Sequence, residues 1–144
     1  MKFNKRVSFL VIFFLLFILT ITPRSVVEDF SFPCYRDEEV YISCGTAYVL
    51  NSTPPVLCNF EHPPFAKYFI GLFSILGIAR FIYVGLALAS GVLLYLLVRG
   101  FSGGNWICGV IVFLFFSFDT IVFNTHRFLL LDPVALFFTL LSVY

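Results

Sequence analysis

Long apolar runs alternate with short polar stretches along the chain. Residues 7–22 read VSFLVIFFLLFILTIT without a charge, which approaches the length that crosses a ~30 Å hydrocarbon core once flanking residues are added. Lys2, Lys5 and Arg6 precede this run, and such a basic flank stays in the cytoplasm by the positive-inside tendency. The pattern predicts a membrane helix at about 7–22 with a cytoplasmic N-terminus. Because no clear small-x-small cleavage site follows, it favours an uncleaved anchor over a signal peptide.

A polar stretch at 23–64 comes next and is predicted to form an outer loop. The apolar run after it exceeds the length of one crossing and is interrupted by Lys67 and Arg80. We divide this run near Arg80. The first part, about 65–80, is predicted to be a helix lying in the membrane interface, with both cationic side chains reaching toward headgroups. The second part, about 81–98, is predicted to cross inward.

The remaining chain predicts one further crossing and the start of another. Arg99 and a glycine-rich turn follow the second crossing on the cytoplasmic side. A third membrane helix is expected at about 105–123, and a fourth begins at 133–144 but is too short to cross. We therefore expect the N-terminal part of a larger polytopic protein, with a split gene and a partner chain as the alternative.

Composition supports a membrane protein. Of the 144 residues, 60% are hydrophobic and 12% are charged, and the mean hydropathy is +1.01, far outside the range of soluble domains. The formal net charge of +1 gives no basic excess, so nucleic acid is not an expected partner. We expect an all-α, multi-pass integral membrane protein, in the cell membrane of a prokaryote or the endoplasmic reticulum membrane of a eukaryote.

Three polar clusters fall on the outer side in this topology. They read YRDEEVY at 35–41, EHPPFAK at 61–67 and THRFLLLDP at 125–133. Acids and bases beside helix ends at a membrane surface usually mark a site when they converge. The order and membrane side of the clusters therefore predict one outer site.

Each cluster also has a plainer interpretation when taken alone. The acids at 37–39 are typical of a solvated acidic face. Glu61 and His62 fit a helix cap and a surface histidine, while Arg127 fits a cation at the membrane boundary. For Asp132 we favour a cap of the fourth helix.

Together the clusters resemble a known family. Asp37-Glu38 after the first membrane helix, the His-Pro-Pro-Phe-Ala-Lys run at 62–67, and the Arg-Phe-Leu-Leu-Leu-Asp-Pro run at 127–133 are similar to motifs of the protein O-mannosyltransferases. The resemblance covers the chain after its first helix. It implies the N-terminal helices of a GT-C-type transmembrane glycosyltransferase, with the interfacial helix in the first outer loop.

The resemblance implies transfer of a sugar from a polyprenyl or dolichyl phosphate to an acceptor hydroxyl. The acceptor must lose a proton as its oxygen attacks the anomeric carbon, and a partly desolvated carboxylate serves as base. By resemblance Asp37 is this base, with Glu38 as a coupled neighbour.

The leaving lipid phosphate requires cations to hold its charge. Arg127 offers a planar fork and Lys67 a point charge, so both are predicted to bind the donor phosphate. Pro63 and Pro64 suit the first turn of the interfacial helix. The remaining candidates are Glu61 and His62, which line the substrate site, and Asp132, which is structural.

The sequence assigns neither a metal site nor a disulfide pairing. One histidine with scattered acids is poor support for a metal site, so none is assigned, and a divalent ion stays an alternative. Cys34, Cys44 and Cys58 lie in the outer loop, where a disulfide is permitted and three pairings are open, whereas Cys108 is predicted to pack in a membrane helix.

The predicted function is transfer of a sugar, mannose by resemblance, to a protein Ser/Thr hydroxyl on the outer or lumenal side. The alternatives are a related lipid-linked-sugar transferase acting on a glycolipid or glycan, and a truncated non-catalytic membrane subunit. Expected partners are the lipid-linked sugar, the acceptor, membrane lipid, and a partner chain that supplies the remaining helices. The motifs alone do not imply that this chain works by itself.

Overall fold

The computed structural model describes residues 35–144, which form helices and no strands. This confirms the all-α class for the described part of the chain. The predicted first membrane helix at 7–22, the orientation of the N-terminus and Cys34 lie outside the described residues.

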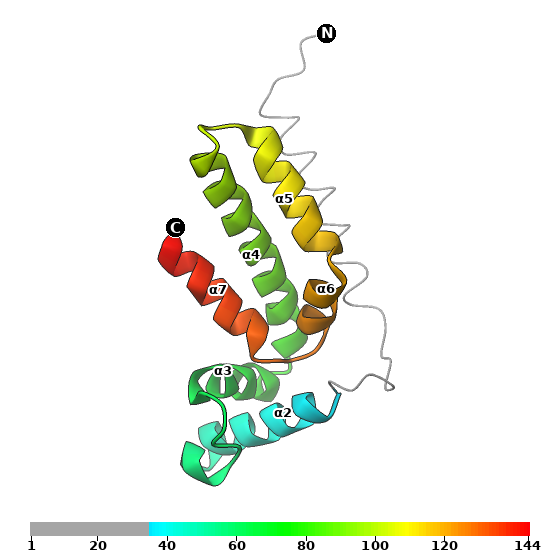
Figure 1. The fold of residues 1–144 in the computed structure, drawn as a ribbon. Helices are drawn as coiled ribbons and strands as arrows, with labels where there is room; N and C mark the ends of the chain where they lie inside the picture. Colours follow the sequence, from blue (N-terminus) through cyan, green and yellow to red (C-terminus); the bar gives the residue numbers. More distant parts are fainter. Residues whose placement is uncertain (1–34) are drawn as a thin grey trace.

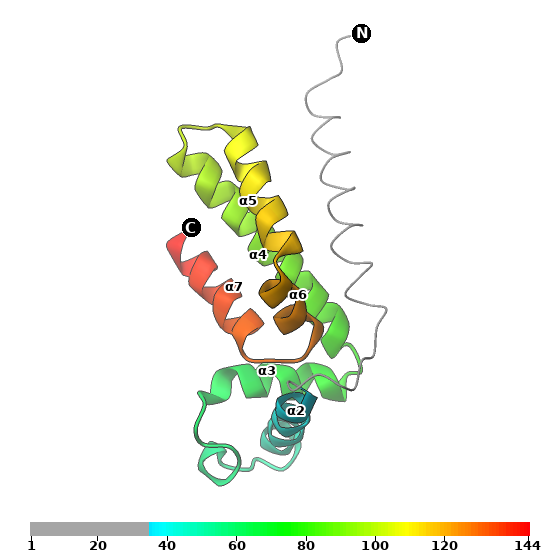
Figure 2. The ribbon, with the colours of Figure 1, turned by 45° about the vertical axis from the view of Figure 1, so that its right-hand side comes forward.

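Two helices lie across one end of the molecule (Figures 1 and 2). They are α2, Tyr35–Leu50, and α3, Pro64–Ile75, and a loop with the short 3-10 turn η1, Pro55–Leu57, joins them. Helix α2 lies within the predicted outer loop, where sequence reasoning placed no helix.

Glycines let α2 and α3 touch backbone to backbone. A Cβ on Gly45 would collide with the carbonyl oxygen of Lys67, and a Cβ on Gly71 would collide with the backbone of Gly45. Only residues without a side chain fit such an approach. The two helices therefore form one closely packed unit.

The other described helices rise from this unit as a bundle. Helix α4, Ala79–Phe101, lies antiparallel to α5, Trp106–Phe118, and α7, Asp132–Val143, runs beside α4 (Figure 1). The turn after α4 uses Gly103 and Gly104 at φ of 66° and 89°, a region that favours glycine.

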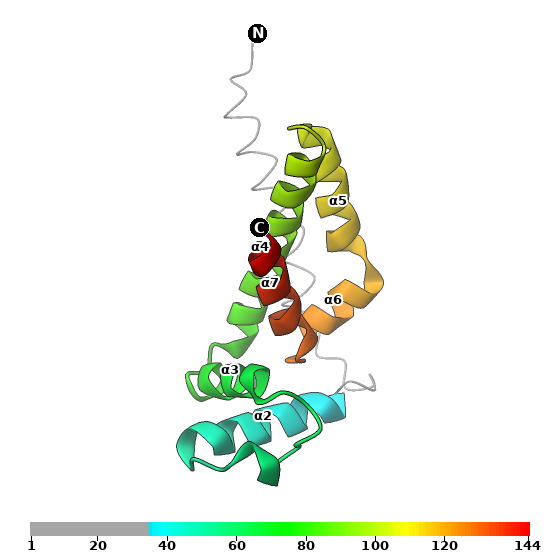
Figure 3. The ribbon, with the colours of Figure 1, turned by 60° about the vertical axis from the view of Figure 1, so that its left-hand side comes forward.

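The predicted third membrane segment is broken rather than straight. Helix α5 ends at Phe118, and α6, Thr120–Arg127, continues after a bend of 60°, which Figure 3 shows clearly. Asp119 lies between them in an extended conformation, and its carboxylate accepts a hydrogen bond of 2.9 Å from the Val122 N–H. Asp119 therefore ends one helix and caps the next.

Within residues 35–144, α4 is the one single helix long and apolar enough to cross a membrane. The bent pair α5 and α6 passes the same test when counted as one span, whereas α3 and α7 are shorter apolar helices. The multi-pass architecture beyond α4 stays a prediction.

The best-buried apolar cluster lies where α2 and α3 meet the foot of the bundle. It joins both crosswise helices to α4 and to the segment between α6 and α7. Its members are Tyr41, Ala66, Ile70, Ala79, Tyr83, Leu86, Phe128, Leu129, Leu130 and Val134.

Candidate active site

Side chains from all three polar clusters meet around this apolar cluster. Glu38 of α2 lies against Arg80 of α4 and the backbone of Leu129, in the third polar cluster. From the second cluster, the ring of His62 meets the ring of Tyr41 edge to face, with 5.9 Å between centroids. The clusters are thus neighbours in space, as their predicted convergence requires.

Glu38 and Arg80 form the charged centre of this junction. A distance of 2.8 Å separates Arg80 Nη2 from Glu38 Oε1. The other terminal nitrogen, Nη1, donates to the backbone carbonyl of Arg127 at 2.8 Å. One guanidinium therefore links α2, α4 and the end of α6.

Burial determines the chemistry of Glu38. Its side chain is only 2% exposed. Burial raises the pKa of this carboxyl, while Arg80 and the Leu129 backbone N–H act in the opposite direction and the neighbouring Glu39 adds to the rise. Partial burial was expected for the carboxylate of Asp37, but the buried carboxylate is that of Glu38.

Asp37 itself is exposed in the first turn of α2. A residue one position along a helix points about 100° around the axis, so adjacent acids face different surroundings. Asp37 is open to solvent, whereas Glu38 faces the protein.

A second contact holds the backbone that follows α6. The Tyr83 hydroxyl donates to the carbonyl oxygen of Leu130 at 2.5 Å, in a fully buried position. With the Arg80 bond to Arg127, it anchors the segment 127–131 to the first two turns of α4. Side chains of α4 thereby position the third polar cluster.

Within that cluster, Arg127 is the first residue of the anchored segment, and Asp132 follows directly after it. Arg127 is half-buried, and its guanidinium carbon lies 5.6 Å from the centroid of the Phe128 ring. Asp132 is exposed and is the first residue of α7, whose N-cap is Leu131 without a side-chain cap. Asp132 therefore does not make the predicted cap, although an acid in a first turn is favourable to the helix dipole.

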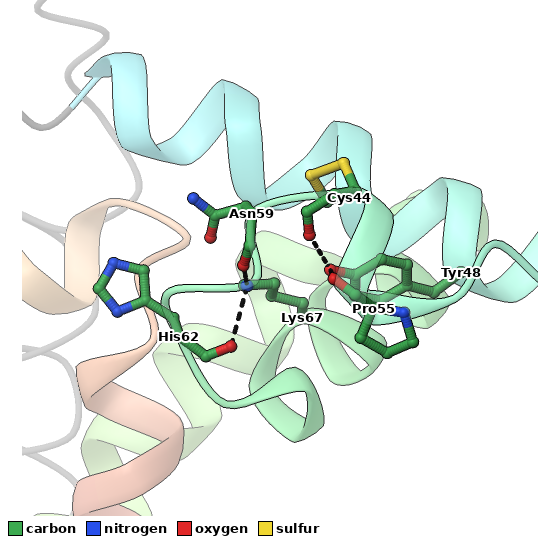
Figure 4. Close-up of a disulfide and its surroundings, with 7 residues drawn as sticks. Cys44, Tyr48, Pro55, Asn59, His62 and Lys67 are labelled. Atoms are coloured by element: carbon green, nitrogen blue, oxygen red, sulfur yellow. Dashed lines mark hydrogen bonds between the residues drawn. A yellow bond between two sulfur atoms is a disulfide. The ribbon is translucent and has the colours of Figure 1, made fainter.

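Lys67 faces the loop before α3 rather than lipid headgroups. Figure 4 shows its ammonium nitrogen donating to the backbone carbonyls of Asn59 and His62, the latter at 3.1 Å. The side chain is fully buried, and burial lowers the pKa of Lys67, with nearby Glu61 acting against that shift. Lys67 was predicted to reach outward to lipid headgroups and the donor phosphate. Instead, its side chain binds the loop and holds the second cluster in place.

A disulfide ties the middle of the same loop to α2. Cys44 and Cys58 are bonded, which selects one of the pairings left open by the sequence. The Tyr48 hydroxyl donates to the Cys58 carbonyl beside it (Figure 4). Cys108 is a free, half-buried cysteine in α5.

The two prolines stand where α3 begins. Helix α3 starts at Pro64, and Pro63 is its N-cap residue, without a side-chain cap. Glu61 and His62 just before them are exposed. They face solvent at the mouth of the helix, and neither side chain caps it.

Sequence reasoning missed the roles of Arg80 and Tyr83. Both belong to an apolar run, where Arg80 was interpreted as a cation that reaches toward headgroups. The sequence did contain a signal for Arg80. A charged side chain in an apolar run costs free energy unless it pairs with an acid or a carbonyl oxygen. No group of three or more metal-ligating side chains occurs among residues 35–144.

Residues 35–144 thus form an all-helical structure. It contains one helix long and apolar enough to cross a membrane, with an acid and a cation paired near the start of that helix. Residues 77–144 match the family model of the dolichyl-phosphate-mannose-protein mannosyltransferases. This is the family that the three motifs resemble, and the match confirms that resemblance. It includes the motif at 127–133, whereas Asp37-Glu38 and the motif at 62–67 precede it.

No curated protein and no solved structure matches the chain significantly.

Proposed function

We propose that this chain belongs to a membrane glycosyltransferase that moves mannose from a polyprenyl phosphate to a protein Ser/Thr hydroxyl. The family match supports a mannosyltransferase in general. The single observation that carries the site is the junction in which Arg80 joins Glu38, next to Asp37, to the carbonyl of Arg127. It brings together the segments that would carry base and phosphate ligand.

In the proposed reaction Asp37 accepts the proton of the acceptor hydroxyl. The hydroxyl oxygen forms a bond to the anomeric carbon, and the bond from that carbon to the phosphate oxygen breaks. The polyprenyl phosphate leaves with the bonding electrons. The exposure of Asp37 supports this role, because a general base must reach the hydroxyl it deprotonates.

We assign the leaving phosphate to Arg127. A guanidinium can bind two phosphate oxygens through its planar fork. Lys67 was predicted to share this task, but its ammonium already donates to two carbonyl oxygens in the loop. We therefore propose that Lys67 holds the loop that carries Glu61 and His62 at the site edge.

The site would lie on the outer or lumenal side of the membrane. Helix α4 supports membrane insertion by its length and apolar character. A partner chain or further helices would complete the groove for the lipid donor.

Transfer of labelled mannose from polyprenyl phosphate mannose tests the proposal. The chain in membranes, with and without its downstream gene product, is offered an acceptor peptide rich in serine and threonine, and separately a glycolipid. We expect labelled peptide, and we expect Asp37→Asn to abolish labelling while Glu39→Gln, an exposed acid on the same helix, retains it.

Label appearing in the glycolipid alone would replace the proposed acceptor with a lipid. No transfer under any of these conditions would overturn the proposal in favour of a non-catalytic subunit. Normal membrane insertion of Asp37→Asn is the control that separates lost chemistry from lost folding.

A further inference from the structure

The contact between the buried Glu38 and the exposed Arg80 joins the two segments to which the proposed chemistry belongs. We propose that these residues form a latch that positions the start of α2, with Asp37, against the segment 127–131, with Arg127. The catalytic consequence of the latch depends on the proposed function, whereas its structural part does not.

The geometry of Arg80 suits a latch. Its two terminal nitrogens each lie 2.8 Å from an acceptor, one on the Glu38 side chain and one on the Arg127 backbone. Because the guanidinium is planar and rigid, fixing one acceptor fixes the direction of the other. A lysine at position 80 has a single nitrogen and cannot hold both in the same fixed geometry.

Burial separates the roles of the two acids. Glu38 is 2% exposed, whereas the Arg80 side chain that closes over it is 56% exposed. Glu38 therefore has no open face toward an acceptor hydroxyl or a sugar phosphate. It acts as a positioning residue, and the exposed Asp37 beside it keeps access to substrate.

The latch adds a polar link to the apolar contacts that join α2 to the bundle. Helix α2 packs along α3, and its packing on α4 is slight. The ion pair reaches across this boundary from the first turn of α2 to the first turn of α4. Tyr83, one turn further along α4, holds Leu130 from the same side. The start of α4 thus anchors both the start of α2 and the segment 127–131.

Hydrogen exchange of the membrane-embedded chain tests the structural part. The variants are Glu38→Met, Arg80→Met and the double variant, since methionine fills similar space without donating to or accepting these bonds. Matched controls are Glu39→Met and Arg99→Met, which remove exposed charges from the same two helices. Arg80→Lys keeps the positive charge next to Glu38, and we expect this milder variant to fold if Glu38→Met does not.

We expect amide exchange at 128–131 to rise about tenfold in either single variant. The double variant should exchange no faster than Arg80→Met, because both changes break one connection. Arg80→Lys should be intermediate, and the controls should match the unaltered chain. Unchanged exchange in the single variants, or fully additive effects in the double variant, would overturn the latch.

Steady-state kinetics test the positioning part. For Glu38→Met we expect kcat per folded molecule to fall more than tenfold while KM for the acceptor changes little. Faster exchange with an unchanged kcat per folded molecule would reduce the latch to a stability element and refute positioning. If the unaltered chain transfers no sugar, the proposed function fails, but the exchange result still decides whether the latch exists.

Discussion

At the residue scale, the structure separates two adjacent acids by their surroundings. Asp37 is exposed, while Glu38 is buried against Arg80. The sequence shows two acids of the same type and cannot show which one faces the protein. That difference depends on where α2 packs, and the partner that determines it, Arg80, lies 42 positions further along the chain in an apolar run.

The buried carboxyl makes the stability of the fold depend on pH. Burial raises the pKa of Glu38 above its ordinary 4.5, and the groups near this carboxyl are Arg80, the Leu129 N–H, Glu39 and the Tyr83 hydroxyl. The pKa of Glu38 is higher in the folded chain than in the unfolded chain, so protonated Glu38 favours folding. This contribution to the free energy of unfolding is fully present below pH 4.5 and is lost as the pH rises through the pKa of the folded chain. Glu38→Gln does not titrate, so we expect the advantage of the unaltered chain over this variant to shrink as pH rises.

Thermal unfolding in detergent from pH 4 to pH 8 measures this difference. Glu39→Gln serves as the control, because it removes an exposed acid beside the same site. An advantage of the unaltered chain that grows with rising pH would mean that attraction to Arg80 outweighs burial.

Lys67 offers a second prediction at this scale. Its ammonium donates to the carbonyls of Asn59 and His62, which otherwise depend on water. Lys67→Met keeps the buried volume but removes the donor, so we expect faster amide exchange at 59–62 with little change in α4. Exchange at 59–62 that matches the unaltered chain would show that the disulfide holds the loop without Lys67.

At the element scale, the length of the apolar runs located helices better than the local pattern of polar and apolar residues did. Helices α3 and α4 occupy much of the ranges 65–80 and 81–98 that apolar length and charge placement had indicated. Helix α2 was missed because its sequence mixes acids, tyrosines and small residues without a strong apolar stripe. The bend at Asp119 was missed because a single acid in an apolar run was not interpreted as a cap.

The crossing of α2 and α3 gives a prediction with a matched control. Gly45→Ala places a methyl group against the backbone of α3, whereas Gly85→Ala in α4 meets nothing within 4 Å. We expect Gly45→Ala to lower the free energy of unfolding by about 1–3 kcal/mol through overpacking. Gly85→Ala should leave stability equal or higher by about 0.5–1 kcal/mol, since alanine favours a helix over glycine.

Chemical denaturation monitored by circular dichroism compares the two variants. Equal stability of Gly45→Ala and Gly85→Ala would show that α2 and α3 cross with more space than the structure gives them. Stability gained by both would lead to the same conclusion.

At the scale of the whole molecule, the chain gathers three sequence-distant polar clusters at one end of a helical bundle. The motif order predicted that they face one another, and contacts among Glu38, Arg80, Leu129, Tyr41 and His62 bring them together. The sequence could not predict the anchoring role of α4, because the same residues fit an ordinary membrane boundary. The family model of the dolichyl-phosphate-mannose-protein mannosyltransferases matches residues 77–144, the part of the chain that holds α4 to α7.

We propose that this junction supports sugar transfer with Asp37 as the base. The most direct measurement is the rate of mannose transfer by Asp37→Gly with and without added formate, using the chain together with whatever partner supports transfer. We predict a loss of about 100-fold to 10,000-fold, as for removal of a general base, and partial recovery when formate replaces the missing carboxylate. An Asp37→Gly variant that transfers mannose at the rate of the unaltered chain would contradict the account.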